Sequence, residues 1–339
     1  MEYYIVPWKD IAENYYQGTI LLGNGASIAV HSKFKYESLF LNAKQENLLS
    51  GYIDDLFAYF NTNDFELILR LVWQAHNVNK SLRIYDYRTS WAYSSIRDCL
   101  IKSVLNVHSK YDEVSHKLPM MYNFLKNFNM VFSLNYDLLV YWTMTYGINV
   151  SDGHRFKDCF LNAAFDDDWS KFRVNSEKYK EKSNTLVFYP HGSLALSRDI
   201  EGVESKIHSN GDSLLSNILN SWKEERCVPL FVSEGTAQQK IASIHNSYYL
   251  STVYREVLAS KQTALTILGW GIGEQDQHLL QRISRAGIQR VAVSVFGNDQ
   301  DYCHRTFQTI VKYLGNIRID FFSSESPECW VYKEDSGAL

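Results

Sequence analysis

The chain of 339 residues is 45% hydrophobic and carries a formal net charge of −4, so it can bury a full core, and its scattered lysines and arginines offer no continuous surface for nucleic acid. Its five cysteines form no CxxC pair, which excludes a disulfide framework and a four-cysteine zinc site. Because no uncharged apolar run approaches the ~20 residues of a membrane span and the N-terminus lacks a signal-peptide core, we expect a cytoplasmic protein without membrane attachment.

Six short apolar runs end in small or polar residues, which is the pattern of buried parallel strands. In chain order they are residues 19–25, 129–137, 185–193, 229–236, 264–273 and 289–299. Apolar residues spaced three and four apart predict helices in most of the gaps. The expected helices are residues 52–60, 64–76, 90–108, 137–146, 213–225 and 276–287, the last ending at Gly287. We therefore predict an α/β fold, a Rossmann-like parallel sheet with helices on both faces.

Two segments are longer than the connections that such a sheet needs. About a hundred mostly helical residues separate the first two expected strands, and we interpret residues 45–127 as an inserted helical subdomain. Residues 1–44 and 128–339 then form the Rossmann-like domain. A polar insertion spans about 147–184, and we interpret its acidic triplet, Asp166 to Asp168, as a helix start rather than a metal site.

The first expected strand runs into a turn of little side-chain bulk, with the sequence GNGAS at residues 23–27. Glycine permits a tight turn and a close approach of a ligand to the backbone, and Ser27 could cap the helix that follows. Free N–H groups at such a helix start can bind phosphate. A purely structural role explains this turn equally well, because it lacks the full GxGxxG spacing.

Polar side chains follow the second and third expected strands. Asn135 and Asp137 are two positions apart, so both would face one crevice in an extended segment; alternatively, Asp137 caps the next helix. An unpaired amide at a buried strand end is costly, which favours a ligand-facing role for Asn135. His191, in the stretch YPHGS, suits general-base catalysis near neutral pH, although single histidines are more often structural. Since parallel strands end at one edge of a sheet, we expect these side chains to share a pocket with later glycine turns.

The order of these segments resembles the sirtuin (silent information regulator) fold family, in which a glycine-rich loop, an Asn-x-Asp segment and a His-Gly dipeptide surround NAD. The chain is more similar to a bacterial branch of sirtuin-like proteins known only as a domain of unknown function. The matching segments are residues 23–27, 135–142, 191–192, 229–236 and 249–254. This resemblance covers most of the chain and is weakest over 45–127 and 147–184.

The resemblance implies roles for individual residues. Asn135, supported by Asp137, would order the nicotinamide ribose or the attacking water, and His191 would be the base. Nicotinamide is a cationic leaving group that needs no general acid, so an amide and an imidazole would suffice, and no metal is expected. The residues expected to contact NAD are Gly23, Asn24, Gly25, Ala26 and Ser27 at its phosphates, and Gly269, Trp270, Gly271 and Asn298 at its adenosine half.

The implied activity departs from that of sirtuin deacylases, which carry a four-cysteine zinc module that this chain lacks. The resemblance points instead to NAD hydrolases that act as effectors of bacterial anti-phage defence, cleaving NAD to ADP-ribose and nicotinamide and so depleting it. Such effectors imply a homo-oligomer or a complex with a sensor protein. Two alternatives stay open: an ADP-ribosyltransferase, and a non-catalytic module that senses NAD or ADP-ribose.

Two further groups of residues are not assigned a role in the reaction. His108, Asp112 and His116 could suggest a metal site, but residues eight apart on a helix cannot share one ion, so we prefer a helix end. The turn at residues 233–236 follows an expected strand and is a candidate to close over the ligand.

Overall fold

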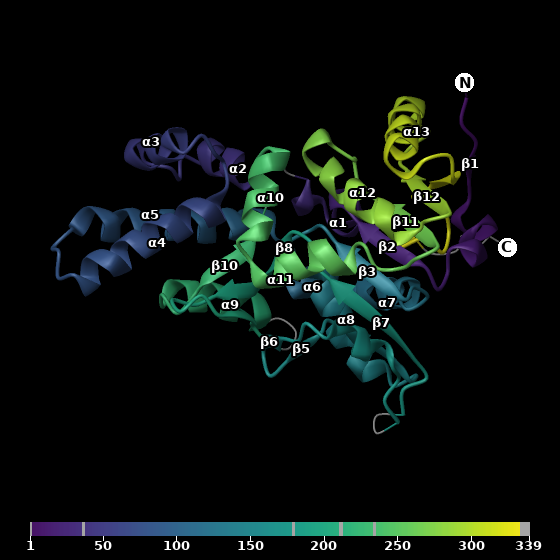
Figure 1. The fold of residues 1–339 in the computed structure, drawn as a ribbon, viewed down its shortest axis with the longest axis horizontal. Helices are drawn as coiled ribbons and strands as arrows, with labels where there is room; N and C mark the ends of the chain where they lie inside the picture. Colours follow the sequence, from purple (N-terminus) through teal and green to yellow (C-terminus); the bar gives the residue numbers. More distant parts are fainter. Residues whose placement is uncertain (1, 36–37, 178–179, 210–212, 233–234, 333–339) are drawn as a thin grey trace.

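The computed structural model describes residues 2–35, 38–177, 180–209, 213–232 and 235–332 (Figure 1). Its largest sheet consists of β1 (Ile5–Val6), β2 (Thr19–Leu22), β3 (Met130–Ser133), β4 (His154–Lys157), β7 (Ser183–Phe188), β11 (Ala264–Leu268), β12 (Arg290–Val295) and β13 (Arg318–Ser323). All neighbouring strands in it pair in parallel, in the order β1-β13-β12-β11-β2-β3-β7-β4. The predicted α/β fold with a large parallel sheet is confirmed.

The six strands between β1 and β4 are arranged as in a Rossmann fold. Numbered by their place in the chain, β2, β3, β7, β11, β12 and β13 lie side by side in the order 3-2-1-4-5-6. The order reverses between β2 and β11. In open sheets of this kind, ligands bind outside the carboxyl ends of the strands at that point.

A second, antiparallel sheet was not expected from the sequence. It contains β10 (Val228–Phe231), β8 (Gly192–Arg198), β9 (Glu204–Lys206), β6 (Ala164–Phe165) and β5 (Phe160–Leu161), in that order. The run at 229–236, expected to be a parallel strand, forms β10 and pairs antiparallel with β8. This expectation was wrong because a short apolar run does not specify the direction of its partner. The polar insertion at 147–184 is also structured, since it supplies β4, β5 and β6.

Helices lie on both sides of the large sheet (Figure 1). They are α1 (Asn24–Val30), α2 (Leu39–Gln45), α3 (Gly51–Tyr59), α4 (Phe65–Ser81), α5 (Tyr87–Val107), α6 (Tyr111–Val114), α7 (Leu118–Leu125), α8 (Leu139–Val150), α9 (Ser213–Lys223), α10 (Ala237–His245), α11 (Tyr248–Thr252), α12 (Gln277–Ile283) and α13 (Gln300–Leu314). The six expected helices are all present, and Gly287, at φ +81°, ends the turn that continues α12. None of the described helices is long and apolar enough to cross a membrane.

The helices between β2 and β3 fall into two groups. Figure 1 shows α3, α4 and α5 projecting to one side, away from both termini, whereas α7 packs against α8 beside the large sheet. Buried side chains of α4 and α5, such as Phe65 and Leu100, nevertheless belong to the same hydrophobic core as the strands. The proposed subdomain boundaries at 45 and 127 stay a prediction. In the polar insertion, Asp168 precedes the short helix Trp169–Arg173, as expected for a helix start.

Candidate functional site

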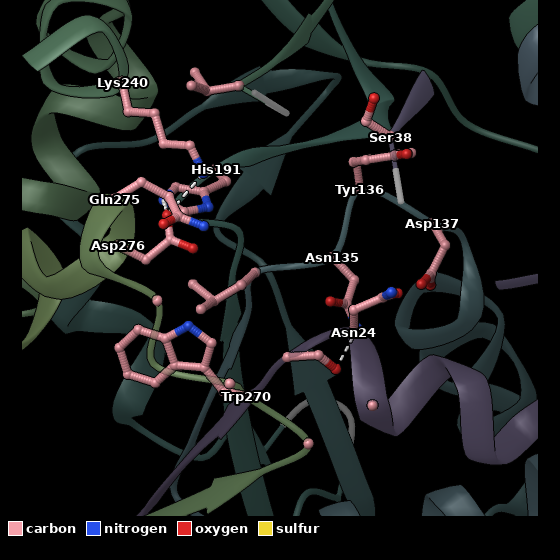
Figure 2. Close-up of a pocket in the computed structure, with 17 residues that line it drawn as sticks. Asn24, Ser38, Asn135, Tyr136, Asp137, His191, Lys240, Trp270, Gln275 and Asp276 are labelled. Carbon is pink, nitrogen blue, oxygen red and sulfur yellow. Dashed lines mark hydrogen bonds and ion pairs between the residues drawn. The ribbon is translucent and has the colours of Figure 1, made fainter. Parts of the chain in front are cut away.

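A cavity of about 460 Å³ lies at the point where the strand order of the large sheet reverses (Figure 2). Segments that follow β2, β3, β7 and β11 all contribute to its wall, so residues from four separate strand ends lie together. The lining residues are Gly23, Asn24, Gly25, Ser38, Leu134, Asn135, Tyr136, Asp137, His191, Val232, Lys240, Gly269, Trp270, Gly271, Gly273, Gln275 and Asp276.

Asn135, Ser27 and Asp137 form one hydrogen-bonded chain along a wall of this cavity. Asn135 Nδ2 donates to Ser27 Oγ at 2.7 Å and to the Gly23 carbonyl at 2.9 Å. Ser27 Oγ donates to Asp137 Oδ2 at 2.5 Å, and Asp137 Oδ1 accepts from the Leu139 N–H at the start of α8, at 2.9 Å. Both amide hydrogens of Asn135 are therefore used. This fixes the amide and leaves its Oδ1 as the atom that can accept from a ligand.

These hydrogen bonds decide between the two interpretations of Asp137, as a helix cap or as a cavity residue. They also correct the interpretation of Ser27 as a helix cap. Asp137 binds the first N–H of α8 and also faces the cavity, so it has both roles. Ser27 lies inside α1 and is 1% exposed, whereas Gly23 is the residue that precedes the helix. The expectation that Ser27 caps α1 was wrong, because Asn135 and Asp137 take its hydroxyl.

Asp137 gives the protein a pH-dependent term in its stability. Burial raises the pKa of Asp137 from 3.8 to about 6, although its hydrogen bonds from Ser27 and Leu139 act in the opposite direction. A carboxyl with a raised pKa in the folded state stabilises most below its unfolded pKa, and the contribution is lost as pH rises to about 6. The loss amounts to at most about 3 kcal/mol.

We expect Asp137→Asn to remove this loss while keeping the hydrogen bond from Leu139, with the new amide nitrogen donating to Ser27 Oγ in place of the carboxylate that accepted from it. The free energy of unfolding in urea, measured from pH 4 to pH 7 for both proteins, should show the variant gaining on the wild type as pH rises. The measurement compares the two proteins because other groups also titrate in this range. Burial lowers the pKa of His108 and His154 to about 4, so their contribution to the free energy of unfolding increases as pH rises, in both proteins alike. A difference that is constant with pH would contradict this role.

The two glycine turns at the cavity pack backbone against backbone. Gly23 N–H donates to the Leu268 carbonyl at 2.9 Å, and Gly25 N–H donates to the Gly269 carbonyl at 2.7 Å. Gly269 has φ +68°, and a Cβ there would lie 2.2 Å from the Ala26 nitrogen. The close packing of the two backbones is therefore sufficient to explain why both turns consist of small residues. The N–H of Gly25 is already paired, so it is not free for a phosphate.

Gly269→Ala should separate the two turns and destabilise the protein by about 3 kcal/mol or more, because it adds both positive-φ strain and a backbone clash. Gly271→Ala is the matched control, since nothing lies within 4 Å of a Cβ added there. Urea unfolding of the two variants checks this expectation. Equal stability of the variants would show that the turns do not depend on their close approach.

A second cavity, of about 660 Å³, adjoins the first and shares Gly25, Gly269, Trp270 and Gly271 with it. Its remaining wall is largely apolar and aromatic, and includes Ile28, Ala29, Leu268, Phe296, Tyr302, Trp330 and Tyr332. A flat aromatic ligand such as adenine suits walls of this kind.

Trp270 stands in the wall common to both cavities. The side chain is 5% exposed, and its Nε1 has no hydrogen-bond partner among the described residues. Figure 2 shows the indole nitrogen turned toward the first cavity. Asn298, expected at the adenosine half, is exposed and accepts from Gln300 Nε2 at 2.9 Å, and it is the next residue, Asp299, that lines the second cavity.

His191 lies on the other side of the first cavity in a buried polar cluster with Lys240 and Asp276 (Figure 2). His191 Nε2 is 3.9 Å from Asp276 Oδ1, and Lys240 Nζ is 2.8 Å from the same oxygen. Burial lowers the pKa of His191 to about 3, against the attraction of Asp276. Burial would raise the pKa of Asp276, but its interactions with His191 and with the Lys240 ammonium lower it. At neutral pH the imidazole is therefore neutral, and a nearby carboxylate is available to stabilise it once it takes a proton.

Sequence reasoning missed Asp276 and His278 and assigned no role to Lys240. Asp276 and His278 belong to the stretch EQDQH, which was interpreted only as the start of a helix. Their position directly after a glycine turn at a strand end was the available signal. Lys240 comes from α10, which follows the antiparallel strand β10. Of the turn expected to close over the ligand, residues 233 and 234 lie outside the described part of the chain.

The alternative metal cluster around His108 has a different role. His108 is 3% exposed, its Nε2 accepts from the Leu138 N–H at 3.1 Å, and its Nδ1 lies 2.7 Å from the Ser109 carbonyl. Both ring nitrogens are thus used in anchoring the start of α8. Asp112 and His116 are exposed on the neighbouring turns, away from this contact.

Residues 20–330 match a family described as "Domain of unknown function (DUF4917)". The chain belongs to this family. Every residue of the first cavity lies within the range that matches the DUF4917 domain. The family description states no activity, and no curated protein matches the sequence. The chemistry of this DUF4917 domain therefore has to be argued from its site.

Proposed function

We propose that the protein is an NAD hydrolase that cleaves the bond between nicotinamide and ribose, giving ADP-ribose and nicotinamide. The observation that carries this proposal is the pair of adjoining cavities at the reversal point of the sheet, which share a wall of glycines and Trp270. One cavity is aromatic, and the other holds an amide and an imidazole. A dinucleotide with its adenosine in the second cavity and its nicotinamide ribose in the first matches this division.

The residues of the first cavity can carry out the proposed reaction without a general acid. As the C1′–N bond breaks, nicotinamide leaves with the bonding electron pair, and C1′ becomes oxocarbenium-like. Asn135 Oδ1, held by the bonds of its amide to Ser27 and Gly23, would orient the ribose or the water. His191 would take a proton from the water as its oxygen bonds to C1′, and Asp276 would stabilise the imidazolium. The net change is NAD⁺ plus water to ADP-ribose, nicotinamide and a proton.

Two other outcomes use the same cavity. A transferase would pass ADP-ribose to an acceptor in place of water, and a sensor would bind NAD without cleaving it. Incubation of purified protein with adenine-labelled NAD and a mixture of protein and nucleic acid acceptors separates the three. Hydrolysis predicts free labelled ADP-ribose and an equal amount of nicotinamide. Label on an acceptor would favour the transferase, and bound but intact NAD would favour the sensor.

The proposed biological role is depletion of NAD during phage infection, in an assembly with further copies or with a sensor protein. The resemblance to sirtuin-like effectors supports this role. The projecting helices and the loop between α4 and α5 also support an assembly, because they expose large aromatic side chains: Tyr52 is 80%, Tyr59 83% and Tyr85 96% exposed. Toxicity in cells should then depend on His191 and Asn135.

A further inference from the structure

Three potential metal ligands converge beside the first cavity, namely His191, Asp276 and His278. One ligand atom from each lies within 4.8 Å of the others. Both histidines are 5% exposed. His191 Nε2 and both ring nitrogens of His278 have no hydrogen-bond partner among the residues that the structure describes. Unpaired buried polar atoms are costly, and coordination of a metal is one way to satisfy a neutral imidazole.

We propose that His191, Asp276 and His278 bind one divalent transition-metal ion, with Zn²⁺ as the best match. Two imidazoles and one carboxylate form a ligand set that suits Zn²⁺, whereas Mg²⁺ and Ca²⁺ prefer oxygen ligands alone. His191 and Asp276 line the cavity, so a fourth position remains open on that side. The sequence did not lead us to expect this site, because His191 and the other two ligands are about 85 residues apart in the chain.

Lys240 is the competitor of such an ion. Its Nζ lies 2.8 Å from Asp276 Oδ1, and its side chain is only 6% exposed, so the ammonium is held against the carboxylate. A divalent cation at the same oxygen is repelled by this charge. Metal binding therefore requires the ammonium to leave Asp276 or to move to its other oxygen. Removal of the ammonium should therefore tighten metal binding. If Lys240 only supported the structure of the site, its removal should weaken metal binding instead.

Metal binding has a consequence for catalysis that rests on the proposed function. A neutral imidazole that coordinates a metal through one ring nitrogen keeps its proton on the other nitrogen. Neither nitrogen of His191 can then accept a proton from water. The bound ion would therefore inhibit NAD cleavage, whereas the binding itself does not depend on the reaction.

Titration of the purified full chain with Co²⁺, followed by its visible absorption, tests the site directly. We expect one bound ion per chain, binding about 100-fold weaker in His278→Ala, and binding about tenfold tighter in Lys240→Met. His116→Ala replaces an exposed histidine and should bind as the wild type does. Circular dichroism confirms that each variant is folded. Absence of Co²⁺ binding by the wild type, or equal binding by His278→Ala, would overturn the proposal.

Zn²⁺ added to the NAD cleavage assay separates this proposal from the proposed function. Inhibition of the wild type that is lost in His278→Ala supports the metal site and its inhibitory role. Co²⁺ binding in a protein that leaves NAD intact both alone and in every co-expressed assembly would refute the hydrolase and keep the metal site. NAD cleavage by a protein that binds no Co²⁺ would refute the metal site and keep the hydrolase.

Discussion

Replacement of His191 by alanine is expected to lower NAD cleavage by about 10²- to 10⁴-fold, which is the usual contribution of a positioned general base. The imidazole is neutral, lines the cavity and has Asp276 3.9 Å from its Nε2, so it is placed to take the proton and to be stabilised once it has done so. The initial rate of nicotinamide release measures the effect, and calorimetry with NAD measures binding. We expect the rate to fall and NAD affinity to change by less than about tenfold.

Two further variants make the His191 result specific. Asn135→Ala removes the proposed acceptor and should also abolish most turnover while keeping most NAD affinity. His154→Gln replaces another buried histidine, which bonds to Ser183 at the far edge of the sheet, and should leave turnover per folded molecule unchanged. Full activity in His191→Ala or in Asn135→Ala would show that the assigned roles are wrong.

The variant Arg198→Met is expected to destabilise the fold by about 3–5 kcal/mol, because it leaves the buried carboxylate of Glu204 without its cation, whereas Glu66 keeps Arg70 at 3.4 Å. Arg198 Nη2 donates to Glu204 Oε1 at 2.7 Å and to the Asn246 carbonyl at 3.0 Å, and Arg198 Nη1 lies 3.9 Å from Glu66 Oε1. The side chains of Glu66 and Glu204 are 4% and 8% exposed. Burial raises the pKa of Glu66 to about 8, so this carboxyl is already costly to ionise.

The same ion-pair cluster connects the projecting helices to the cavity. Glu66 belongs to α4, and Glu204 Oε2 accepts from the Tyr249 N–H at 2.8 Å. Tyr249 Oη in turn accepts from the Tyr189 N–H at 2.9 Å, two residues before His191. We therefore expect Arg198→Met to weaken NAD binding as well as the fold.

Urea unfolding of Arg198→Met is best compared with that of Arg226→Met. Arg226 pairs with Glu224 on the surface, with its side chain 66% exposed, and such a pair contributes about 0–1 kcal/mol. A loss of stability in Arg198→Met no larger than in Arg226→Met would mean that the buried cluster does not hold the helices to the sheet.

The strands of the large sheet were predictable where they are buried on both faces. The apolar runs at 19–25, 129–137 and 264–273 correspond to β2, β3 and β11, each buried along its length. The antiparallel sheet was missed, because β8 starts only four residues after β7 ends, its neighbour β9 is only three residues long, and its other partner, β10, begins only at Val228. Pairing between such segments is not encoded in the local apolar pattern.

The candidate site was predictable to the extent that topology determines it. Side chains after parallel strands must meet at one edge of the sheet, which is why Asn135 and His191 line one cavity. The hydrogen bonds of Ser27 and the cluster of Asp276 with Lys240 were not predictable, since they depend on contacts between residues that are far apart in the chain. The glycines at 23 and 269 were recognised, but their packing on each other was not.

Release of nicotinamide from NAD tests the central claim most directly. Purified protein, alone and after co-expression with the products of neighbouring genes, is incubated with NAD, and nicotinamide and ADP-ribose are followed by chromatography over time. The proposed function predicts equal amounts of both products in at least one of these preparations, released about 100-fold or more slowly by the His191→Ala variant. NAD that stays intact in every preparation, or cleavage that His191→Ala does not affect, would contradict it.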